Sequence, residues 1–72
     1  MRKVFKMEDL ECANCAAKMQ DAIAKIDGVN SVNISFMTKK LTLDAEDERF
    51  DAILDAAQKA ISKFEKDCVI VR

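Results

Sequence analysis

The sequence predicts a small α+β domain in which two helices cover one face of an antiparallel β-sheet. Two observations lead to this class. Apolar residues recur at helical spacing in two segments, and apolar and polar residues alternate along the segments that flank them. The segments follow the order strand, helix, strand, strand, helix, strand. This is the ferredoxin-like β-α-β-β-α-β two-layer sandwich, and we assign residues 1–72 to it as one domain.

The first half of the chain is expected to contribute a strand, a helix and a second strand. Residues 4–7 have a short β pattern, and residues 31–36 alternate between apolar and polar side chains. Residues 15–27 carry a helical apolar stripe, and Gly28, the only glycine, is expected to end that helix. The stripe consists of Ala16, Met19, Ile23 and Ile26.

The second half is expected to repeat the pattern. Residues 37–40 are the predicted turn, and residues 41–45 alternate again as the hairpin partner. Residues 49–63 have apolar side chains at helical spacing, and Phe64 continues this stripe into the core. Residues 68–71 close the domain as a strand.

The pair Cys12 and Cys15 is the strongest functional signal in the chain. Two thiols three positions apart can converge on a metal ion or on each other. The chain has no His, which excludes imidazole ligands, and no second Cys-x-x-Cys pair, which excludes a closed four-thiolate zinc site within one chain. An open two-sulfur metal site and a redox dithiol both remain possible.

The composition of the chain argues against several classes of binding partner. The formal net charge is −1, whereas a nucleic-acid-binding domain normally carries a basic face. No apolar run approaches the roughly 20 residues of a membrane span, and no signal peptide is recognisable. Three cysteines do not form a paired disulfide framework. We therefore expect a cytoplasmic monomer with free thiols, no nucleic-acid partner and no membrane span.

Residues 10–19, which read LECANCAAKM, resemble the signature of the heavy-metal-associated domain. That family carries Gly-Met-x-Cys-x-x-Cys in the loop between its first strand and first helix. The element order, the corner at residues 27–29 and the final strand extend the resemblance over the whole chain. Two positions depart from the pattern: Asp9 stands where Gly is common, and Leu10 where Met is common. Leu10 is still expected to be buried beneath the loop.

The resemblance implies a metal-binding module that holds its ion at Cys12 and Cys15. Such domains are soluble metallochaperones or cytosolic N-terminal modules of metal-transporting P-type ATPases, and they catalyse no reaction by themselves. The implied partners are the metal ion and either another metal-binding domain or the transmembrane transport domain of an ATPase. Of these, the resemblance favours the ATPase module.

Glu11 distinguishes between metals. Copper members of the family usually have Thr or Ser before the first Cys, whereas zinc, cadmium and lead members often have a carboxylate there. Copper(I) is soft and is satisfied by two thiolates, while zinc requires about four ligands and accepts oxygen. Two thiolates and Glu11 together carry three negative charges, which suit a divalent ion. We therefore expect zinc or cadmium at Cys12, Cys15 and Glu11, with copper(I) in a stand-alone metallochaperone as the alternative.

A thiol-disulfide oxidoreductase is the alternative from another class, because Cys-x-x-Cys at a strand-to-helix junction also describes thioredoxin-like enzymes. The absence of Pro from the chain counts against it, since those enzymes place a cis-proline beside the dithiol. Several other residues receive structural interpretations. Cys68 is expected in the core or on a sheet face rather than as a third thiolate ligand, Asp9 is expected to be solvated, and Lys39 and Lys40 are interpreted as a solvated hairpin tip.

Overall fold

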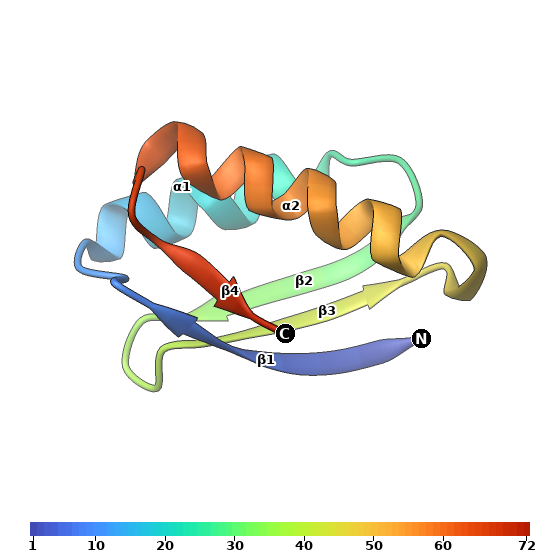
Figure 1. Ribbon diagram of the computed structural model, residues 1–72, viewed down its shortest axis with the longest axis horizontal. Coiled ribbons are helices and arrows are strands. Elements are labelled where there is room, and N and C mark those ends of the chain that lie inside the picture. The colour runs from blue at the N-terminus through green and yellow to red at the C-terminus, as the bar shows by residue number, and fades with distance from the viewer.

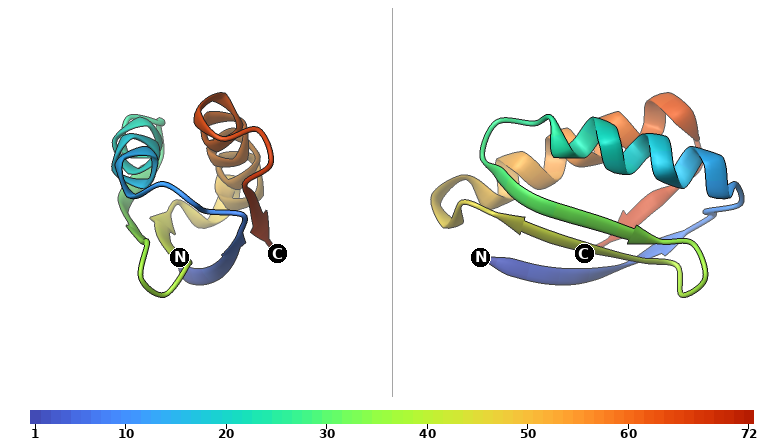
Figure 2. Two further views of the ribbon diagram at one scale, coloured as in Figure 1. Left: turned by 90° about the vertical axis from the view of Figure 1, so that its left-hand side faces the viewer. Right: turned by 180° about the vertical axis from the view of Figure 1, so that it is seen from behind.

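The computed structural model describes residues 1–72 as two layers, with both helices on one face of a four-stranded antiparallel sheet (Figures 1 and 2). The strand order is β2-β3-β1-β4, so the predicted ferredoxin-like fold is confirmed. Every predicted element is present, with bounds that differ by a few residues. In chain order the elements are β1 (Arg2–Glu8), α1 (Ala13–Ala24), β2 (Val29–Ser35), β3 (Lys40–Ala45), the 3-10 turn η1 (Asp47–Arg49), α2 (Phe50–Phe64) and β4 (Val69–Val71).

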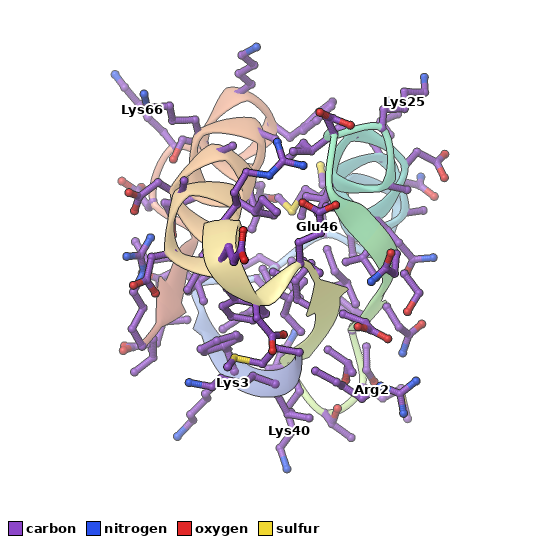
Figure 3. All side chains as sticks on the ribbon, turned by 90° about the vertical axis from the view of Figure 1, so that its right-hand side faces the viewer. Arg2, Lys3, Lys25, Lys40, Glu46 and Lys66 are labelled. Atoms are coloured by element: carbon purple, nitrogen blue, oxygen red, sulfur yellow. The ribbon has the colours of Figure 1, made fainter.

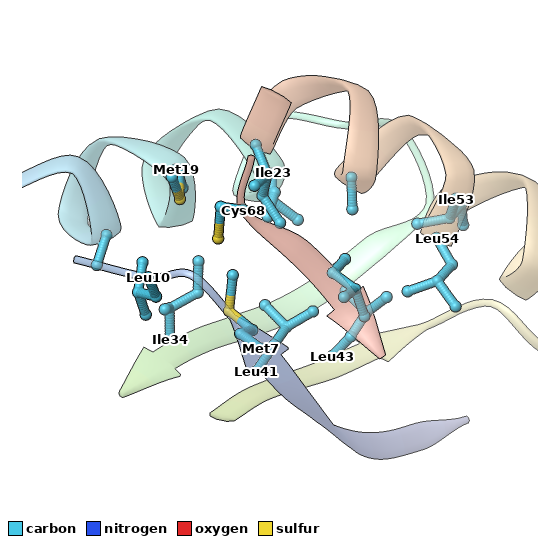
Figure 4. Packing of buried hydrophobic residues seen from close by; sticks show 14 of the residues in the cluster. Met7, Leu10, Met19, Ile23, Ile34, Leu41, Leu43, Ile53, Leu54 and Cys68 are labelled. Atoms are coloured by element: carbon cyan, nitrogen blue, oxygen red, sulfur yellow. The ribbon is translucent and has the colours of Figure 1, made fainter. Parts of the chain in front are cut away.

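Sixteen hydrophobic residues, and no polar ones, are buried between the two layers. The helices contribute the stripes that the sequence predicted, and the strands contribute their inward-facing positions. Leu10 and Cys68 are buried as expected, and both lie in this cluster beside Met19 (Figure 4). Full burial of an aliphatic side chain contributes about 1.5–3 kcal/mol relative to exposure, so this cluster supplies the main attraction between the layers.

Charged side chains point away from the core, as the labelled lysines in Figure 3 illustrate. Neither helix combines the length and the apolar character needed to cross a membrane. Phe64 corrects one expectation, because its side chain is 42% exposed. It is the last residue of α2, three positions beyond Ile61, the last buried residue of that helix. Its helical spacing therefore continues past the edge of the core.

Gly28 has a different role from the one predicted. The helix α1 ends earlier, at Ala24, because the N–H groups of Lys25 and Ile26 bond three residues back and tighten the last turn. Gly28 has a φ of +95° in a turn closed by a 3.2 Å hydrogen bond from the Val29 N–H to the Ile26 carbonyl. A Cβ there would lie 2.7 Å from Cδ1 of Ile53. The turn and the close approach of α2 require this glycine.

Two glutamines occupy the open edges of the sheet. On edge strand β2, the Ile34 N–H donates to Gln20 Oε1 of α1 at 2.9 Å. On edge strand β4, the Ile70 N–H donates to Gln58 Oε1 of α2 at 2.8 Å, and Gln58 Nε2 donates to the Cys68 carbonyl at 3.0 Å. Each helix thus satisfies backbone groups that would otherwise be free to pair with another strand.

Replacing Gln58 by Leu is expected to lower the free energy of unfolding. The change removes both hydrogen bonds to β4 and leaves a partly buried N–H and carbonyl without partners, at a cost of about 1–3 kcal/mol. Denaturant unfolding measures this difference. Lys59→Leu, an exposed neighbour on the same helix, is the control and should shift stability by less than about 0.5 kcal/mol. Equal unfolding midpoints for Gln58→Leu and the unmodified protein would contradict the edge-capping role.

Candidate metal centre

Three connecting segments meet at one end of the molecule, on the left in Figure 1. They are the loop from β1 to α1, the turn from β2 to β3 and the loop from α2 to β4; Figure 2 shows the same grouping from behind. The first of these segments carries Cys12, and Cys15 follows in the first turn of α1. The antiparallel topology therefore brings the predicted thiols next to residues that are far away in the sequence.

Cys12 is the N-cap residue of α1. Its backbone is extended, with φ −129° and ψ 118°, and its Sγ accepts the Cys15 N–H at 3.3 Å. Its carbonyl accepts the Ala16 N–H at 3.0 Å, the first bond of the helix. A side-chain acceptor at this position normally comes from Ser, Thr, Asp or Asn. Here a sulfur satisfies one of the free N–H groups, and the capping geometry directs both thiols to the same side of the loop.

The two thiols differ in acidity. Hydrogen-bond donation from the Cys15 N–H, followed by that from the Cys15 side chain, lowers the pKa of the Cys12 thiol. The hydrogen bond with Cys12 is in turn the largest of the effects that raise the pKa of Cys15 to about 11. The smaller effects are burial, the negative charges of Cys12 and Glu65, and a hydrogen bond with the Glu65 side chain. Cys12 is therefore the more acidic of the two thiols, and Cys15 is the one that holds its proton more firmly.

Glu65 completes the group, and the sequence did not single it out as a ligand. One of its carboxylate oxygens and the Sγ atoms of Cys12 and Cys15 all lie within 4.8 Å of one another. Glu65 is the C-cap of α2, and its position is held by a 2.9 Å bond from its N–H to the Ile61 carbonyl and a 3.2 Å bond from the Cys68 N–H to its own carbonyl. The only sequence signal for it is the short charged loop before the last strand.

The donor set fits a thiophilic divalent ion. Zinc binds thiolate sulfur at about 2.3 Å and carboxylate oxygen at about 2.0–2.2 Å, so neighbouring ligands of one tetrahedral ion lie roughly 3.6–3.8 Å apart. The three donor atoms lie within 4.8 Å of one another, so side-chain movements of up to about 1 Å bring them to this separation. Two sulfurs and one oxygen leave at least one position of a tetrahedron open.

Glu11, the predicted third ligand, lies beside this group rather than within it. Its exposed side chain lines an open hollow of about 340 Å³ together with Asp9, Glu65 and Asp67. Asp9 has a φ of +59°, a left-handed conformation that Gly adopts without strain, which explains why Gly suits this position. The lining of this hollow therefore consists of four acidic residues.

Cys68 lies underneath the site and is fully buried. Burial, with smaller contributions from the negative charges of Glu65 and Asp9, raises the pKa of the Cys68 thiol. Its sulfur is not part of the group formed by Cys12, Cys15 and Glu65. Cys68 therefore behaves as a small apolar core residue, as the sequence predicted.

Comparison with known proteins agrees with this geometry. Residues 4–67 match the model of the heavy-metal-associated domain. This chain belongs to that family. The match includes the Cys12 and Cys15 loop, both helices and the Glu65 turn.

Two curated relatives, the zinc/cadmium/lead-transporting P-type ATPases of Shigella sonnei and Escherichia coli, are 37% identical to this heavy-metal-associated domain over 59 residues. The alignment covers 82% of this chain but only 8% of each relative. Among solved structures, the apo N-terminal domain of ZntA is 30% identical with a TM-score of 0.73, and covers 99% of this chain and 92% of that domain. The CopZ metallochaperone, at 18% identity, has the same fold with a TM-score of 0.75, and covers 99% of this chain and all of that one.

The acidity of the two thiols predicts unequal alkylation in the metal-free domain. Below pH 9, iodoacetamide should modify Cys12 faster than Cys15, because only the thiolate reacts and the pKa of Cys12 is the lower one. In Cys12→Ala the pKa of Cys15 should fall, since the largest cause of its increase is gone. In Cys15→Ala the pKa of Cys12 should stay low, because any residue at position 15 supplies the backbone N–H. Peptide mapping by mass spectrometry measures each rate; equal rates at the two thiols would contradict the assignment.

Proposed function

We propose that this domain binds a divalent zinc or cadmium ion as cargo and exchanges it with a partner protein. The observation that carries this proposal is the convergence of two thiol sulfurs and a carboxylate within 4.8 Å at the surface of a preformed fold. Cys12 and Cys15 are the thiolate ligands, and Glu65 is the third. Glu11, on the rim of the adjacent hollow, supplies a further carboxylate when the ion is bound.

Charge and ligand type favour a divalent ion. With both thiols ionised, Cys12, Cys15 and Glu65 carry three negative charges, and a dication neutralises more of this charge than copper(I) does. The carboxylate also provides the harder oxygen ligand that zinc accepts and copper(I) does not need. The names of the relatives at 37% identity, zinc/cadmium/lead transporters, support the same choice.

The partner takes the ion through the open coordination position. A thiolate or carboxylate of the partner can enter before Cys12, Cys15 or Glu65 leaves, so the ion stays coordinated throughout the transfer. The partner is a second metal-binding domain or the transport domain of a P-type ATPase of which this chain would be the N-terminal module, on the cytosolic face of the membrane. The domain itself performs no chemical reaction in this proposal.

Dithiol redox exchange is the second candidate, because a low-pKa Cys12 beside a high-pKa Cys15 also suits attack on a disulfide. Family membership and the carboxylate beside the thiols favour metal binding. An insulin-reduction assay separates the two. Turnover comparable to that of thioredoxin measured alongside would favour the redox function.

Replacing either thiol in the site should abolish tight binding. A structural zinc site gains about 10–16 kcal/mol from four ligands, so losing one thiolate should cost on the order of 3 kcal/mol, or at least a hundredfold in affinity. Cys12→Ser and Cys15→Ser are titrated with Cd²⁺ under anaerobic conditions, following the thiolate charge-transfer absorbance against a competing chelator. Cys68→Ser is the control. If Cys68→Ser bound as weakly as Cys12→Ser, the two-thiolate site would be wrong.

Removing a ligating carboxylate should weaken the binding of divalent ions without weakening the binding of copper(I). Glu65→Gln is expected to weaken zinc and cadmium binding roughly tenfold to a hundredfold, the effect of losing one charged contact, and to leave copper(I) binding unchanged. Glu11→Gln should have a smaller effect in the same direction. Asp67→Asn, which removes one charge from the same hollow, is the matched control. An equal loss of affinity in Asp67→Asn and Glu65→Gln would mean that the carboxylates act only through their negative charge and not as ligands.

A further inference from the structure

Lys39 is not a solvated hairpin residue, contrary to the sequence interpretation. It ends the turn from β2 to β3, and its half-buried side chain crosses to the loop between β1 and α1. There its Nζ donates a 2.5 Å hydrogen bond to the carbonyl of Leu10. In the opposite direction, the Met7 N–H donates to the Lys39 carbonyl at 2.8 Å. One residue of the turn therefore holds the backbone on both sides of Asp9.

The held segment contains the sharpest bend next to the metal site. Asp9 has a φ of +59° and Lys39 a φ of +56°, both in the left-handed region that is unfavourable for side chains other than Gly. Such conformations persist where surrounding contacts maintain them. Leu10, directly after the bend, is buried, and Cys12 caps α1 two residues later. The hydrogen bond from Lys39 thus acts on the backbone two residues before Cys12.

The ammonium group of Lys39 is itself fixed in place. It lies 3.6 Å from the centroid of the Phe36 ring, a cation–π contact within the same turn. A lysine that only served solubility would extend into water, as the neighbouring Lys40 does (Figure 3). Lys39 is instead held by an aromatic ring on one side and a backbone carbonyl on the other.

We propose that Lys39 is a positioning residue of the metal site, whose ammonium group fixes the Leu10 carbonyl and thereby holds Cys12 and Cys15 in their binding geometry before the ion arrives. This inference rests on the proposed metal-binding function. Supporting contacts of this kind raise affinity because the ligands need not be ordered when the ion binds.

A positioning role and a purely electrostatic role of Lys39 predict opposite changes in metal affinity when its ammonium group is removed. A lysine ammonium near the site repels an incoming dication, so electrostatics alone would make binding stronger when the charge is removed. A positioning residue makes binding weaker when its hydrogen bond is removed. Lys39→Met keeps the unbranched stem over Phe36 and loses the donor, so the sign of its effect distinguishes the two roles.

The test is a Cd²⁺ titration, with a competing chelator, of the whole domain and its Lys39→Met and Lys40→Met variants. We expect Lys39→Met to bind roughly tenfold more weakly, as for loss of one charged hydrogen bond, and Lys40→Met, with the same charge change, to bind as the unmodified domain does. Lys39→Gly removes the side chain while favouring the left-handed backbone, so it should fold and still bind weakly. Unchanged or stronger binding by Lys39→Met, or an equal loss in Lys40→Met, would overturn the inference.

A second measurement works without metal. Amide hydrogen exchange of Cys15 and Ala16, whose N–H groups bond to Cys12, should be several-fold faster in Lys39→Met, while core amides of α2 should be unchanged. Unchanged exchange at these two amides would also overturn the inference. If the unmodified domain bound no Cd²⁺, the proposed function would fail, whereas this exchange experiment would still decide whether Lys39 holds the loop.

Discussion

The hydrogen bond from the Cys15 N–H to the Cys12 sulfur is the constraint on which the site depends. It makes Cys12 the cap of α1 and therefore sets both where the helix begins and where the first thiol points. Because an N-cap acceptor and the third residue of the helix are neighbours in space, the same contact brings the second thiol to the first. The contact that begins the helix therefore also brings the two sulfurs together.

The same hydrogen bond also affects the pKa values of the two thiols before an ion binds. The N–H donors at the start of α1 stabilise the Cys12 thiolate, and this thiolate keeps the proton on Cys15. A bound dication would reverse the second effect, because it replaces the hydrogen bond by coordination and favours the ionised form of Cys15. Metal binding should then release protons from the site, including the one that Cys15 holds.

Local patterns were enough to predict the fold and the two thiols. The helical stripes and the alternating strands have periods that can be read along the chain, and the spacing of Cys12 and Cys15 needs no knowledge of distant residues. The buried positions of Met19 and Cys68 followed the same periods, and the burial of Leu10 was expected from the resemblance to the family. These features could be predicted because each depends on residues within a few positions of one another.

The residues that sequence reasoning missed are those whose partners are distant. Glu65 is 50 positions after Cys15 and joins it only because α1 and α2 lie side by side, with the start of α1 near the end of α2. Lys39 is 29 positions after Leu10, and a pair of lysines in a turn has no local pattern that distinguishes a hydrogen-bonded side chain from a solvated one. Glu11 is adjacent to Cys12 in sequence, but the carboxylate that is grouped with both sulfurs belongs to Glu65, at the C-terminal end of the other helix.

The proposed preference for a dication has an electrostatic basis in the positions of Cys12, Cys15 and Glu65. The thiols are at the N-terminal end of α1, where the helix dipole favours negative charge, but Glu65 is the C-cap of α2, where the dipole disfavours it. Glu65 also lies close enough to Cys12 for its negative charge to act on that thiol, and Asp9, Glu11 and Asp67 line the same hollow as Glu65. Because Coulomb attraction grows with the charge of the cation, these carboxylates would attract a divalent ion more strongly than a monovalent one, which is the electrostatic basis of the proposed choice of zinc or cadmium.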